Sequence, residues 1–249
     1  MSARTFVVGD IHGDLAALRS LMAKLPEPAP SDTLVFLGDY LDRGPDSAGV
    51  IEAVRRLQQH APCKVVALRG NHEDAWLRVL AQGWPEFVLP QGNGCLAAMR
   101  SFTGRTQPTH GEGPAADEID ALFAGSFFPP EVAAWLRALP WWHEDEHAIY
   151  VHAGLVEQDG GFAHPSAIDP PIAMLWTRSE SFFRDYRGKL VVVGHTTTEQ
   201  LPPELSHYTP ADPTDLWAGE NVVAIDTGAG KGGFLTALEL PARRVWESR

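Results

Sequence analysis

The first third of the sequence alternates between short apolar runs and amphipathic stretches, and this alternation limits the possible folds more than any other feature. Three aliphatic or β-branched runs predict buried strands at Arg4–Val8, Thr33–Leu37 and Lys64–Leu68. Between them, apolar residues recur at helical spacing over Leu15–Leu25 and Val50–Leu57. A strand–helix repeat of about 30 residues is typical of βαβ units, which form a parallel sheet.

Strand patterns return in the second half of the chain, at Ala148–His152, Leu190–Gly194, Asn221–Asp226 and Phe234–Leu240. No helical pattern separates the last two, so we expect this half to be more antiparallel. Residues 83–138 contain two helical stretches broken by glycines and prolines, which predicts a cap-like insertion over one end of the sheet. The sequence therefore predicts one α/β domain over residues 1–249, with mixed strands in two sheets.

Composition narrows the class of protein. The 249 residues include 20 Lys and Arg against 32 Asp and Glu, a formal net charge of −12, and 44% are hydrophobic, enough for a proper core. The acidity disfavours nucleic acids and anionic membranes as partners. Cys63 and Cys95 form no CxxC pair and are expected to be free thiols. With no apolar stretch of about 20 residues, we expect a soluble cytoplasmic protein. The oligomeric state stays open, and a monomer is compatible with the sequence.

Each of the first three predicted strands ends in a polar cluster that contains glycine. These clusters are GDIHG at 9–13, GDYLDRG at 38–44 and RGNHE at 69–73. Because parallel strands place their carboxyl ends along one edge, Asp10, Asp39 and Asn71 should converge there. Asp10 and His12 are two positions apart, so both side chains leave the same face of an extended segment.

Two later strands also end in a candidate ligand, His152 in HAGL and His195 in GHT. Carboxylate, imidazole and amide donors without a thiolate suit Mn, Fe or Zn. Six such donors exceed one tetrahedral shell and suit two ions that share a bridging carboxylate. The sequence therefore predicts a dinuclear site for divalent metal ions.

The ordered motifs GDIHG, GDYLDRG, RGNHE, HAGL and GHT resemble those of the metal-dependent phosphoprotein phosphatase (PPP) family. This family lies within the calcineurin-like metallophosphoesterase superfamily, and the resemblance is greatest to its bacterial and bacteriophage serine/threonine phosphatase branch. It extends over roughly residues 4–240. The resemblance implies a two-sheet β-sandwich flanked by helices, with the metal centre at one edge.

The resemblance also implies residue roles. The implied metal ligands are Asp10, His12, Asp39, Asn71, His152 and His195. Asp39 would bridge the two ions, for which Mn is the first expectation and Fe or Zn the alternatives. His72 would be the general acid, held by Asp42, while Arg43, Asn71 and Arg178 would contact the phosphoryl group.

Elementary chemistry is compatible with these roles. Two adjacent divalent ions lower the pKa of a bridging water, so that hydroxide attacks phosphorus directly near neutral pH. A histidine acid then protonates the departing oxygen, a contribution of roughly 10²–10⁴-fold. The predicted activity is that of a phosphomonoesterase for phosphoserine and phosphothreonine proteins, with phosphotyrosine and small phosphate esters as further substrates.

One alternative shares this chemistry, namely a symmetrical dinucleoside tetraphosphatase. Glu73 and the pair Asp42–Arg43 favour the protein phosphatase, because the tetraphosphatase relatives more often carry aspartate at the position of Glu73. A binding module without activity is disfavoured because every predicted ligand and His72 are present.

Two further motifs match catalytic patterns but are not expected to act as such. His143–His147 fits HExxH, yet a strand follows at once where a zinc protease requires a helix, so we expect an acidic hairpin turn. Gly228–Gly233 fits GxGxxG, yet a strand again follows where a dinucleotide site requires a helix. We expect a glycine-rich connection between strands near the active-site edge.

Overall fold

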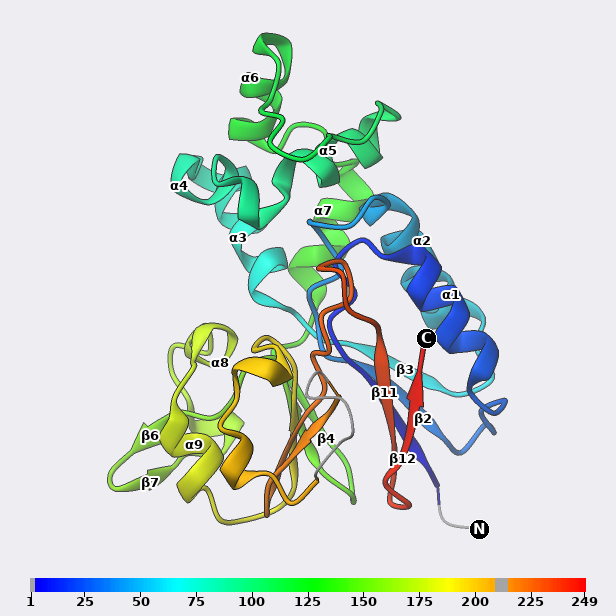
Figure 1. The fold of residues 1–249 in the computed structure, drawn as a ribbon, viewed down its shortest axis with the longest axis vertical. Coiled ribbons are helices and arrows are strands. Elements are labelled where there is room, and N and C mark those ends of the chain that lie inside the picture. Colours follow the sequence, from blue (N-terminus) through cyan, green and yellow to red (C-terminus); the bar gives the residue numbers. More distant parts are fainter. Residues whose placement is uncertain (1–2, 209–214) are drawn as a thin grey trace.

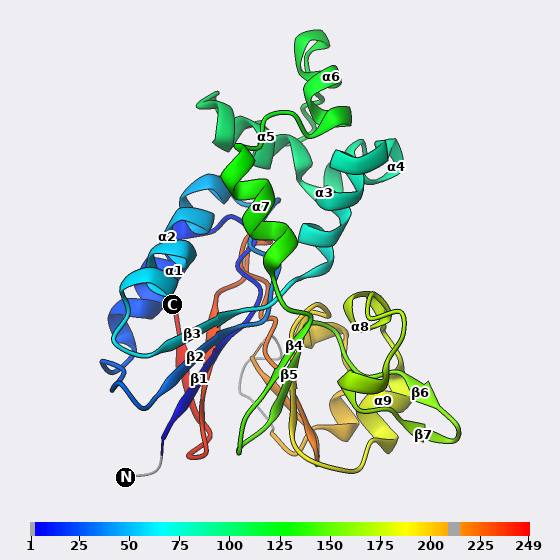
Figure 2. The same cartoon turned by 180° about the vertical axis from the view of Figure 1, so that it is seen from behind.

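Two five-stranded sheets lie face to face in the computed structural model of the chain, with helices on both outer faces (Figures 1 and 2). The structure describes residues 3–208 and 215–249. This arrangement confirms the predicted α/β fold with two mixed sheets flanked by helices.

The first sheet contains the predicted βαβ units. Its strands, in spatial order, are β12 (Arg244–Glu247), β11 (Thr236–Leu240), β1 (Thr5–Val8), β2 (Thr33–Phe36) and β3 (Lys64–Ala67). Strands β1, β2 and β3 are parallel, while β11 pairs antiparallel with both β1 and β12. The helices α1 (Leu15–Lys24) and α2 (Ser47–His60) connect the three parallel strands. Their N-caps are Asp14 and Asp46, whose carboxylates accept backbone N–H groups of the first turn.

The second sheet corrects one expectation. Its strands, in order, are β4 (Trp142–Glu144), β5 (Ile149–Val151), β8 (Val191–Val193), β10 (Val222–Ala224) and β9 (Trp217–Ala218). The central strands β5, β8 and β10 are parallel, and only the edge strands β4 and β9 are antiparallel. The expected antiparallel character is therefore wrong for the centre of this sheet.

Helical segments explain the parallel pairing. Two parallel neighbours need a crossover that carries the chain back to the end of the sheet where the first strand began. The helical segments are η2 (Pro165–Ala167), α8 (Ala173–Trp176) and α9 (Glu180–Asp185) before β8, then η3 (Thr198–Gln200) and η4 (Pro203–Leu205) before β10. A small hairpin, β6 (Glu157–Gln158) and β7 (Gly161–Phe162), lies in the first crossover. Strands β10 and β11 adjoin in sequence but belong to different sheets.

The alternation of side chains along each strand builds three apolar layers. In β1, Phe6 and Val8 face the helices while Val7 faces the other sheet. In β8, Val192 faces the first sheet while its neighbours Val191 and Val193 face α8 and α9. Both sheets are thus buried on both faces, which holds the strand ends rigidly along one edge.

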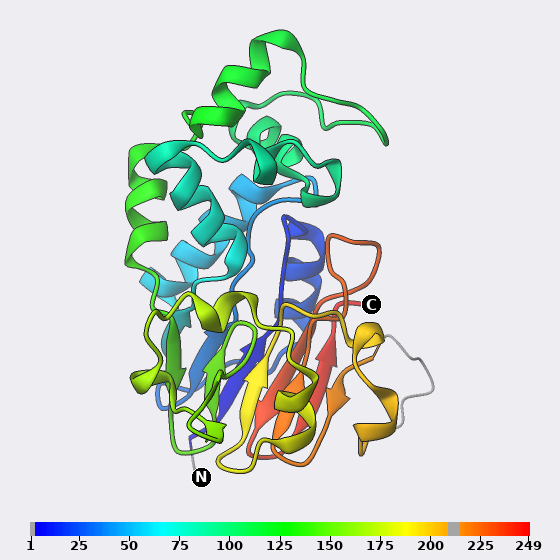
Figure 3. The ribbon, with the colours of Figure 1, turned by 90° about the vertical axis from the view of Figure 1, so that its left-hand side faces the viewer.

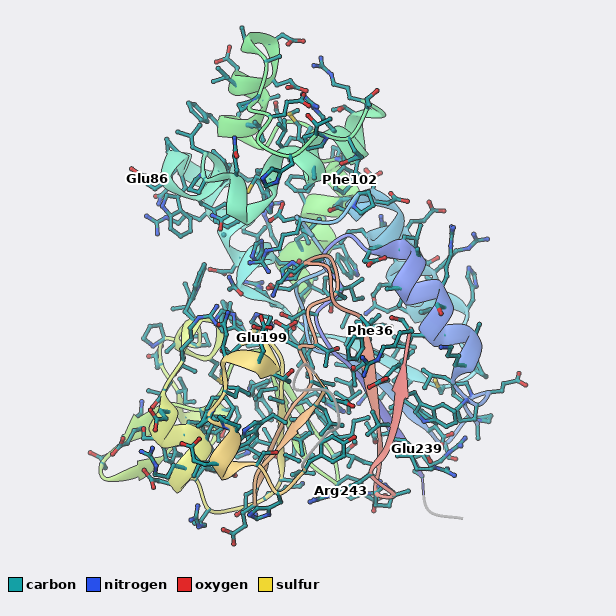
Figure 4. The ribbon with its side chains drawn as sticks, in the orientation of Figure 1. Phe36, Glu86, Phe102, Glu199, Glu239 and Arg243 are labelled. Atoms are coloured by element: carbon teal, nitrogen blue, oxygen red, sulfur yellow. The ribbon has the colours of Figure 1, made fainter. Side chains whose placement is uncertain are left out.

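The segment 83–138 lies beyond that edge, above the sandwich in Figure 3. Its elements are α4 (Pro85–Val88), η1 (Gln91–Asn93), α5 (Cys95–Thr103), α6 (Ala116–Ala124) and α7 (Pro130–Ala138), and it follows α3 (Asn71–Gln82). The structure therefore has four α-helices here where the sequence predicted two helical stretches. Figure 4 labels two of its side chains, Glu86 and Phe102, far from the strands.

The HExxH and GxGxxG matches have the local structures that the sequence predicts. Residues 145–148 form the turn of the β4–β5 hairpin, which confirms the hairpin at the HExxH match. Asp145 is less solvated than expected, since its carboxylate also accepts the hydroxyls of Thr5 and Tyr150. Gly228–Gly233 connects β10 to β11, as expected.

Other expectations concern thiols and membranes. Cys63 and Cys95 are both unpaired in the structure. Within residues 3–208 and 215–249, no helix combines the length and apolar character that crossing a bilayer requires.

Candidate metal and phosphate site

The predicted site residues converge where β1, β2, β3, β5 and β8 end. Among the described residues, seven other than glycine have a positive φ angle. Five of these are predicted site residues, namely His12, Asp39, Asp42, Arg43 and His195, with φ between 46° and 72°. Such backbone costs about 1–3 kcal/mol per residue and persists only where the surroundings impose it. The concentration of strain marks this edge as functional.

Asp39 lies at the centre of the cluster. Its Oδ2 is 3.4 Å from His12 Nε2, and its Oδ1 is 3.5 Å from His152 Nε2. The backbone N–H of His72 donates to Oδ1 at 3.0 Å. A Cβ at Gly70 would lie 2.2 Å from that oxygen, so only glycine fits beside it. Asp39 is thereby fixed between two histidines, as a bridging ligand must be.

Backbone carbonyl groups set the tautomers of two histidines. The Nδ1–H of His12 donates to Leu41 O at 3.0 Å, and that of His152 donates to Leu37 O at 2.9 Å. Each ring therefore presents the lone pair of Nε2 toward Asp39, the orientation in which imidazole binds a metal ion. Arg43 donates to the His12 lone pair at 2.5 Å in this structure.

His195, after β8 of the second sheet, and Asp10, after β1 of the first, complete the cluster. The backbone N–H of His195 lies 3.1 Å from both carboxylate oxygens of Asp10. The ring Nδ1 of His195 is 2.8 Å from Asn71 Oδ1, and the same amide oxygen is 2.9 Å from His152 Nε2. Nε2 of His195 is buried without a hydrogen-bond partner.

Burial and mutual charge shift the pKa values of these groups. Burial lowers the pKa of His12, His152 and His195, the last to about 2, so their rings are neutral, as in metal ligands. Burial, followed by the charges of Asp226 and Asp39, raises the pKa of Asp10. Excess negative charge at this edge favours a cation.

The donor set fits the divalent ions that the sequence predicts. Two buried groups have ligand atoms within 4.8 Å of one another, namely His12–Asp39–His72 and Asp39–His152–His195. They share Asp39, as two adjacent ions with one bridging carboxylate require. The lone pair of His152 faces the acceptor oxygens of Asp39 and Asn71 with no proton between them, and a bound cation relieves that repulsion. Asn71 and Asp10 lie in direct contact with these groups.

His72 is held in the manner expected of a general acid. Its Nδ1 lies 2.6 Å from Asp42 Oδ2, and Trp76 Nε1–H donates to the same carboxylate at 2.9 Å. Asp42 is fully buried and accepts hydrogen bonds from both rings. These contacts hold His72 Nε2 at 4.0 Å from Asp39 Oδ2. The first metal group above also contains His72, so geometry alone allows it to act as a ligand or as an acid.

One cavity opens onto the cluster at His195, and a second adjoins it at Arg43 and Lys231. The sheet-side cavity, of about 630 Å³, is lined by Arg43, Arg178, His195, residues 197–200, residues 227–234 except 229–230, and Arg249. The insertion-side cavity, of about 660 Å³, is lined by Arg43, by insertion residues between Leu89 and Pro114, and by Gly230 and Lys231. Glu199, labelled in Figure 4 at the upper end of the second sheet, belongs to the former. Both predicted arginines therefore border the cluster, with Arg178 NH1 donating to Thr196 Oγ1 at 3.1 Å.

Comparison with known families agrees with this geometry. Residues 3–199 match the family model described as calcineurin-like phosphoesterase. The chain belongs to this family. The narrower assignment to the PPP branch stays a prediction.

Named relatives of this phosphoesterase include symmetrical and asymmetrical bis(5'-nucleosyl)-tetraphosphatases and protein phosphatases. The phosphoesterase is 30% identical to a symmetrical bis(5'-nucleosyl)-tetraphosphatase of Janthinobacterium over 62% of the chain, but the match spans only 44% of that relative. It is 28% identical to a symmetrical bis(5'-nucleosyl)-tetraphosphatase of Methylobacillus flagellatus over 98% of the chain and 94% of the relative. With a protein phosphatase 2A catalytic protein of Dictyostelium discoideum it shares 33% identity over 35% of the chain and 28% of that protein.

A solved structure supports the fold of the phosphoesterase. The crystal structure of a proposed diadenosine tetraphosphatase superposes with a TM-score of 0.61 at 22% identity, covering 99% of this chain and 93% of that one. At this identity the similarity concerns the fold alone.

Sequence reasoning missed several groups of the phosphoesterase site. Trp76 and Asp226 are buried beside predicted residues, and Lys231 lines both cavities. Trp76 had a usable signal, because it lies one helical turn after His72 on the same face of α3. The sequence analysis expected Gly228–Gly233 near the active-site edge but gave Lys231 no role. Nothing in the sequence places Asp226 beside Asp10, since that contact depends on how β10 and β1 meet across the two sheets.

The role of Glu73 differs from the one the sequence analysis gave it. Its carboxylate accepts the backbone N–H groups of Asp39, Tyr40, Leu41 and Gly70. Glu73 is fully buried, and burial and the charge of Asp39 raise its pKa to about 8 against the lowering by these donors. It binds the strand-end loop rather than lining either cavity, so its identity does not report on the substrate.

Proposed function

We propose that this metal-dependent phosphoesterase hydrolyses dinucleoside tetraphosphates, cleaving them symmetrically. The observation that carries this proposal is a pair of cavities that share Arg43 and Lys231, one of which is also lined by the candidate ligand His195. Their volumes, about 630 and 660 Å³, fall in the range of small-molecule sites. A substrate with a nucleoside at each end of a phosphate chain needs two such cavities, one on each side of the reacting phosphorus.

The full-length similarity to a symmetrical tetraphosphatase supports the same substrate class. The sequence analysis placed this activity second, behind serine/threonine phosphatase activity, because of Glu73 and of Asp42–Arg43. The buried position of Glu73 removes part of that argument. Phosphoprotein hydrolysis stays the second candidate, supported by the partial similarity to a protein phosphatase 2A.

We further propose the roles that the sequence predicted for individual residues. Asp10, His12, Asp39, Asn71, His152 and His195 hold two divalent ions, with Mn as the first expectation. When bound, these ions supply Lewis acidity at the reacting phosphoryl group. Arg43, Asn71 and Arg178 bind the phosphoryl oxygens and orient them, since a guanidinium pairs two of its N–H groups with two oxygens.

His72 holds a proton at Nε2 and gives it to the departing oxygen. The 2.6 Å hydrogen bond from Nδ1–H to buried Asp42 orients the ring, so that the proton available for transfer is the one on Nε2. Trp76 and Asp42 together prevent rotation of the ring.

A rate panel tests the proposed function. We expect kcat/KM in Mn²⁺ to be at least about tenfold higher for diadenosine tetraphosphate than for a phosphoserine peptide, with ADP as the nucleotide product. A higher kcat/KM for the phosphopeptide would establish the second candidate instead. Products AMP and ATP would contradict symmetrical cleavage, and turnover that persists in a chelator would contradict metal dependence.

A further inference from the structure

The glycine-rich segment Gly228–Gly233 lies directly against the candidate metal cluster. Gly230 has φ +70°, and a Cβ there would lie 2.3 Å from the carbonyl oxygen of His12. The backbone N–H groups of Lys231 and Gly233 both donate to Gly228 O at 2.9 Å, which folds the segment into a compact turn. A segment that only glycine allows to approach His12 so closely presents whatever side chain it carries to the site.

That side chain is Lys231, the one residue of the segment longer than alanine. Its ammonium lies 3.0 Å from Asp226 Oδ2, and the Asp226 side chain is fully buried. The other carboxylate oxygen of Asp226 accepts the N–H of Gly228 at 3.0 Å. The lysine side chain itself is 23% exposed, so a buried anion anchors a cation whose outer side still faces solvent.

Lys231 borders both cavities together with Arg43. Arg43, Arg178, Lys231 and Arg249 therefore place four cationic side chains around one opening. Arg43 and Arg178 suffice for the oxygens of one phosphoryl group, and of the four only Arg43 and Lys231 also line the second cavity.

We propose that Lys231 binds a phosphate group next to the reacting one, so that the site selects substrates with consecutive phosphates. This inference rests on the proposed function and specifies which residue makes the site a polyphosphate site. A phosphomonoester offers no second anionic group at this position, whereas a tetraphosphate has phosphates on both sides of the cleaved bond.

A purely structural role is the competing explanation, since Lys231 also neutralises buried Asp226. Replacing Lys231 alone leaves that carboxylate unpaired, which is costly and can prevent folding. The pair Asp226→Asn and Asp226→Asn/Lys231→Met avoids this difficulty. These two variants lack the buried charge and differ only in the lysine, while the amide oxygen of the new asparagine still accepts from Gly228.

The experiment measures binding of inorganic tripolyphosphate and of orthophosphate to the Mn²⁺-loaded protein. Calorimetric titration gives the affinity for tripolyphosphate, and inhibition of p-nitrophenyl phosphate hydrolysis gives both inhibition constants, at a fixed concentration of free Mn²⁺. The variants are Lys231→Met, Lys231→Arg and the two Asp226 variants. Lys189→Met is the matched control, because Lys189 also pairs with an acid, Glu144, at 2.9 Å but lines neither cavity.

We expect loss of the lysine charge to weaken tripolyphosphate about tenfold to a hundredfold, the range of one charge-assisted hydrogen bond. The loss for orthophosphate should be at least about fivefold smaller, Lys231→Arg should recover most of the affinity, and Lys189→Met should match the wild type. Equal losses for both anions, or no loss in Asp226→Asn/Lys231→Met relative to Asp226→Asn, would overturn the inference.

The two proposals fail separately. If the wild type does not cleave diadenosine tetraphosphate but binds tripolyphosphate through Lys231, the proposed substrate is wrong and the polyphosphate site stands. If the wild type cleaves the tetraphosphate but its affinity for tripolyphosphate does not depend on Lys231, the proposed function stands and this inference is wrong.

Discussion

The strand-end loops and the insertion above them are built on different principles. The loops combine positive φ angles, buried acids and buried imidazole rings, all within the space of a few side chains. The insertion consists of short helices, two of which end at the left-handed glycines Gly104 and Gly125, and is secured by a buried ion pair. The candidate catalytic groups thus lie where the backbone is strained. The insertion, which borders the second cavity, is built from ordinary capped helices.

This contrast predicts that substitutions in the loops abolish catalysis, while substitutions in the insertion alter the stability of the fold. The largest effect concerns His72. In His72→Asn, we expect hydrolysis of glycerol phosphate to fall by about 10²–10⁴-fold, because its alkoxide needs a proton on departure. Loss for p-nitrophenyl phosphate should be far smaller, since nitrophenolate leaves unaided.

The same variant separates the two roles that geometry allows. Measurement of bound Mn²⁺ should give the same content as in the wild type if His72 is an acid. A content lower by one ion, together with equal losses on both substrates, would make His72 a ligand instead.

The second prediction concerns Arg100 in the insertion. Its guanidinium donates to both carboxylate oxygens of Glu118, at 2.8 and 3.0 Å, and both side chains are buried. Arg100→Met removes the main partner of buried Glu118 and leaves it the 3.3 Å contact with Arg105 NH1 and the backbone N–H of Ala115. We therefore expect a loss of up to about 3–5 kcal/mol in the free energy of unfolding. Urea denaturation measures this loss, and hydrogen exchange should place it in α5 and α6. Arg184→Met, which removes a partner from exposed Glu180 outside the insertion, is the matched control and should change little. Stability equal in the two variants would show that the ion pair does not secure the insertion.

The third prediction is a pH dependence of the insertion. Hydrogen bonds from Arg100 lower the pKa of Glu118 from 4.5 to about 2. Because the folded pKa is the lower one, the pair stabilises fully above about pH 5 and is lost as pH falls toward 2. Protection of α5 and α6 from hydrogen exchange should therefore decrease below pH 4.5 in the wild type. Glu118→Gln should be destabilised at neutral pH and should lose most of this pH dependence. An unchanged pH profile in this variant would assign the pH dependence to another group.

The smallest expected effect tests the corrected role of Glu73. Glu73→Asp shortens the carboxylate that binds four backbone N–H groups of the strand-end loops. Thermal denaturation should show a lower melting temperature. The ratio of kcat/KM for diadenosine tetraphosphate to that for a phosphopeptide should change by less than about threefold, because Glu73 lines neither cavity. A tenfold change in that ratio would restore Glu73 as a determinant of the substrate.

The same contrast explains what could be predicted from the sequence. Central strands such as β1 and β8 are buried on both faces and read as continuous apolar runs, so their predicted ends lie within one residue of the observed ones. The half-exposed strand β12 and the two-residue strands β6 and β9 lack that pattern and were missed.

For the site, glycine and polar residues at strand ends are a local signal, and the predicted residues from Asp10 to His195 do converge. Lys231 was missed because its position depends on the contact of Gly230 with His12, between segments more than 200 residues apart in a 249-residue chain. The helices of the insertion were undercounted because glycine and proline at their ends were taken as breaks rather than as caps.

Metal stoichiometry tests the central claim most directly. The metal-free protein, titrated calorimetrically with Mn²⁺ and then assayed for bound metal, should take up two ions per chain. Asp39→Asn should bind fewer, since both candidate groups depend on that carboxylate, and its turnover should fall by roughly 10³-fold or more. A wild-type chain that binds no Mn²⁺, or an Asp39→Asn variant that still binds two ions and keeps its activity, would contradict the account.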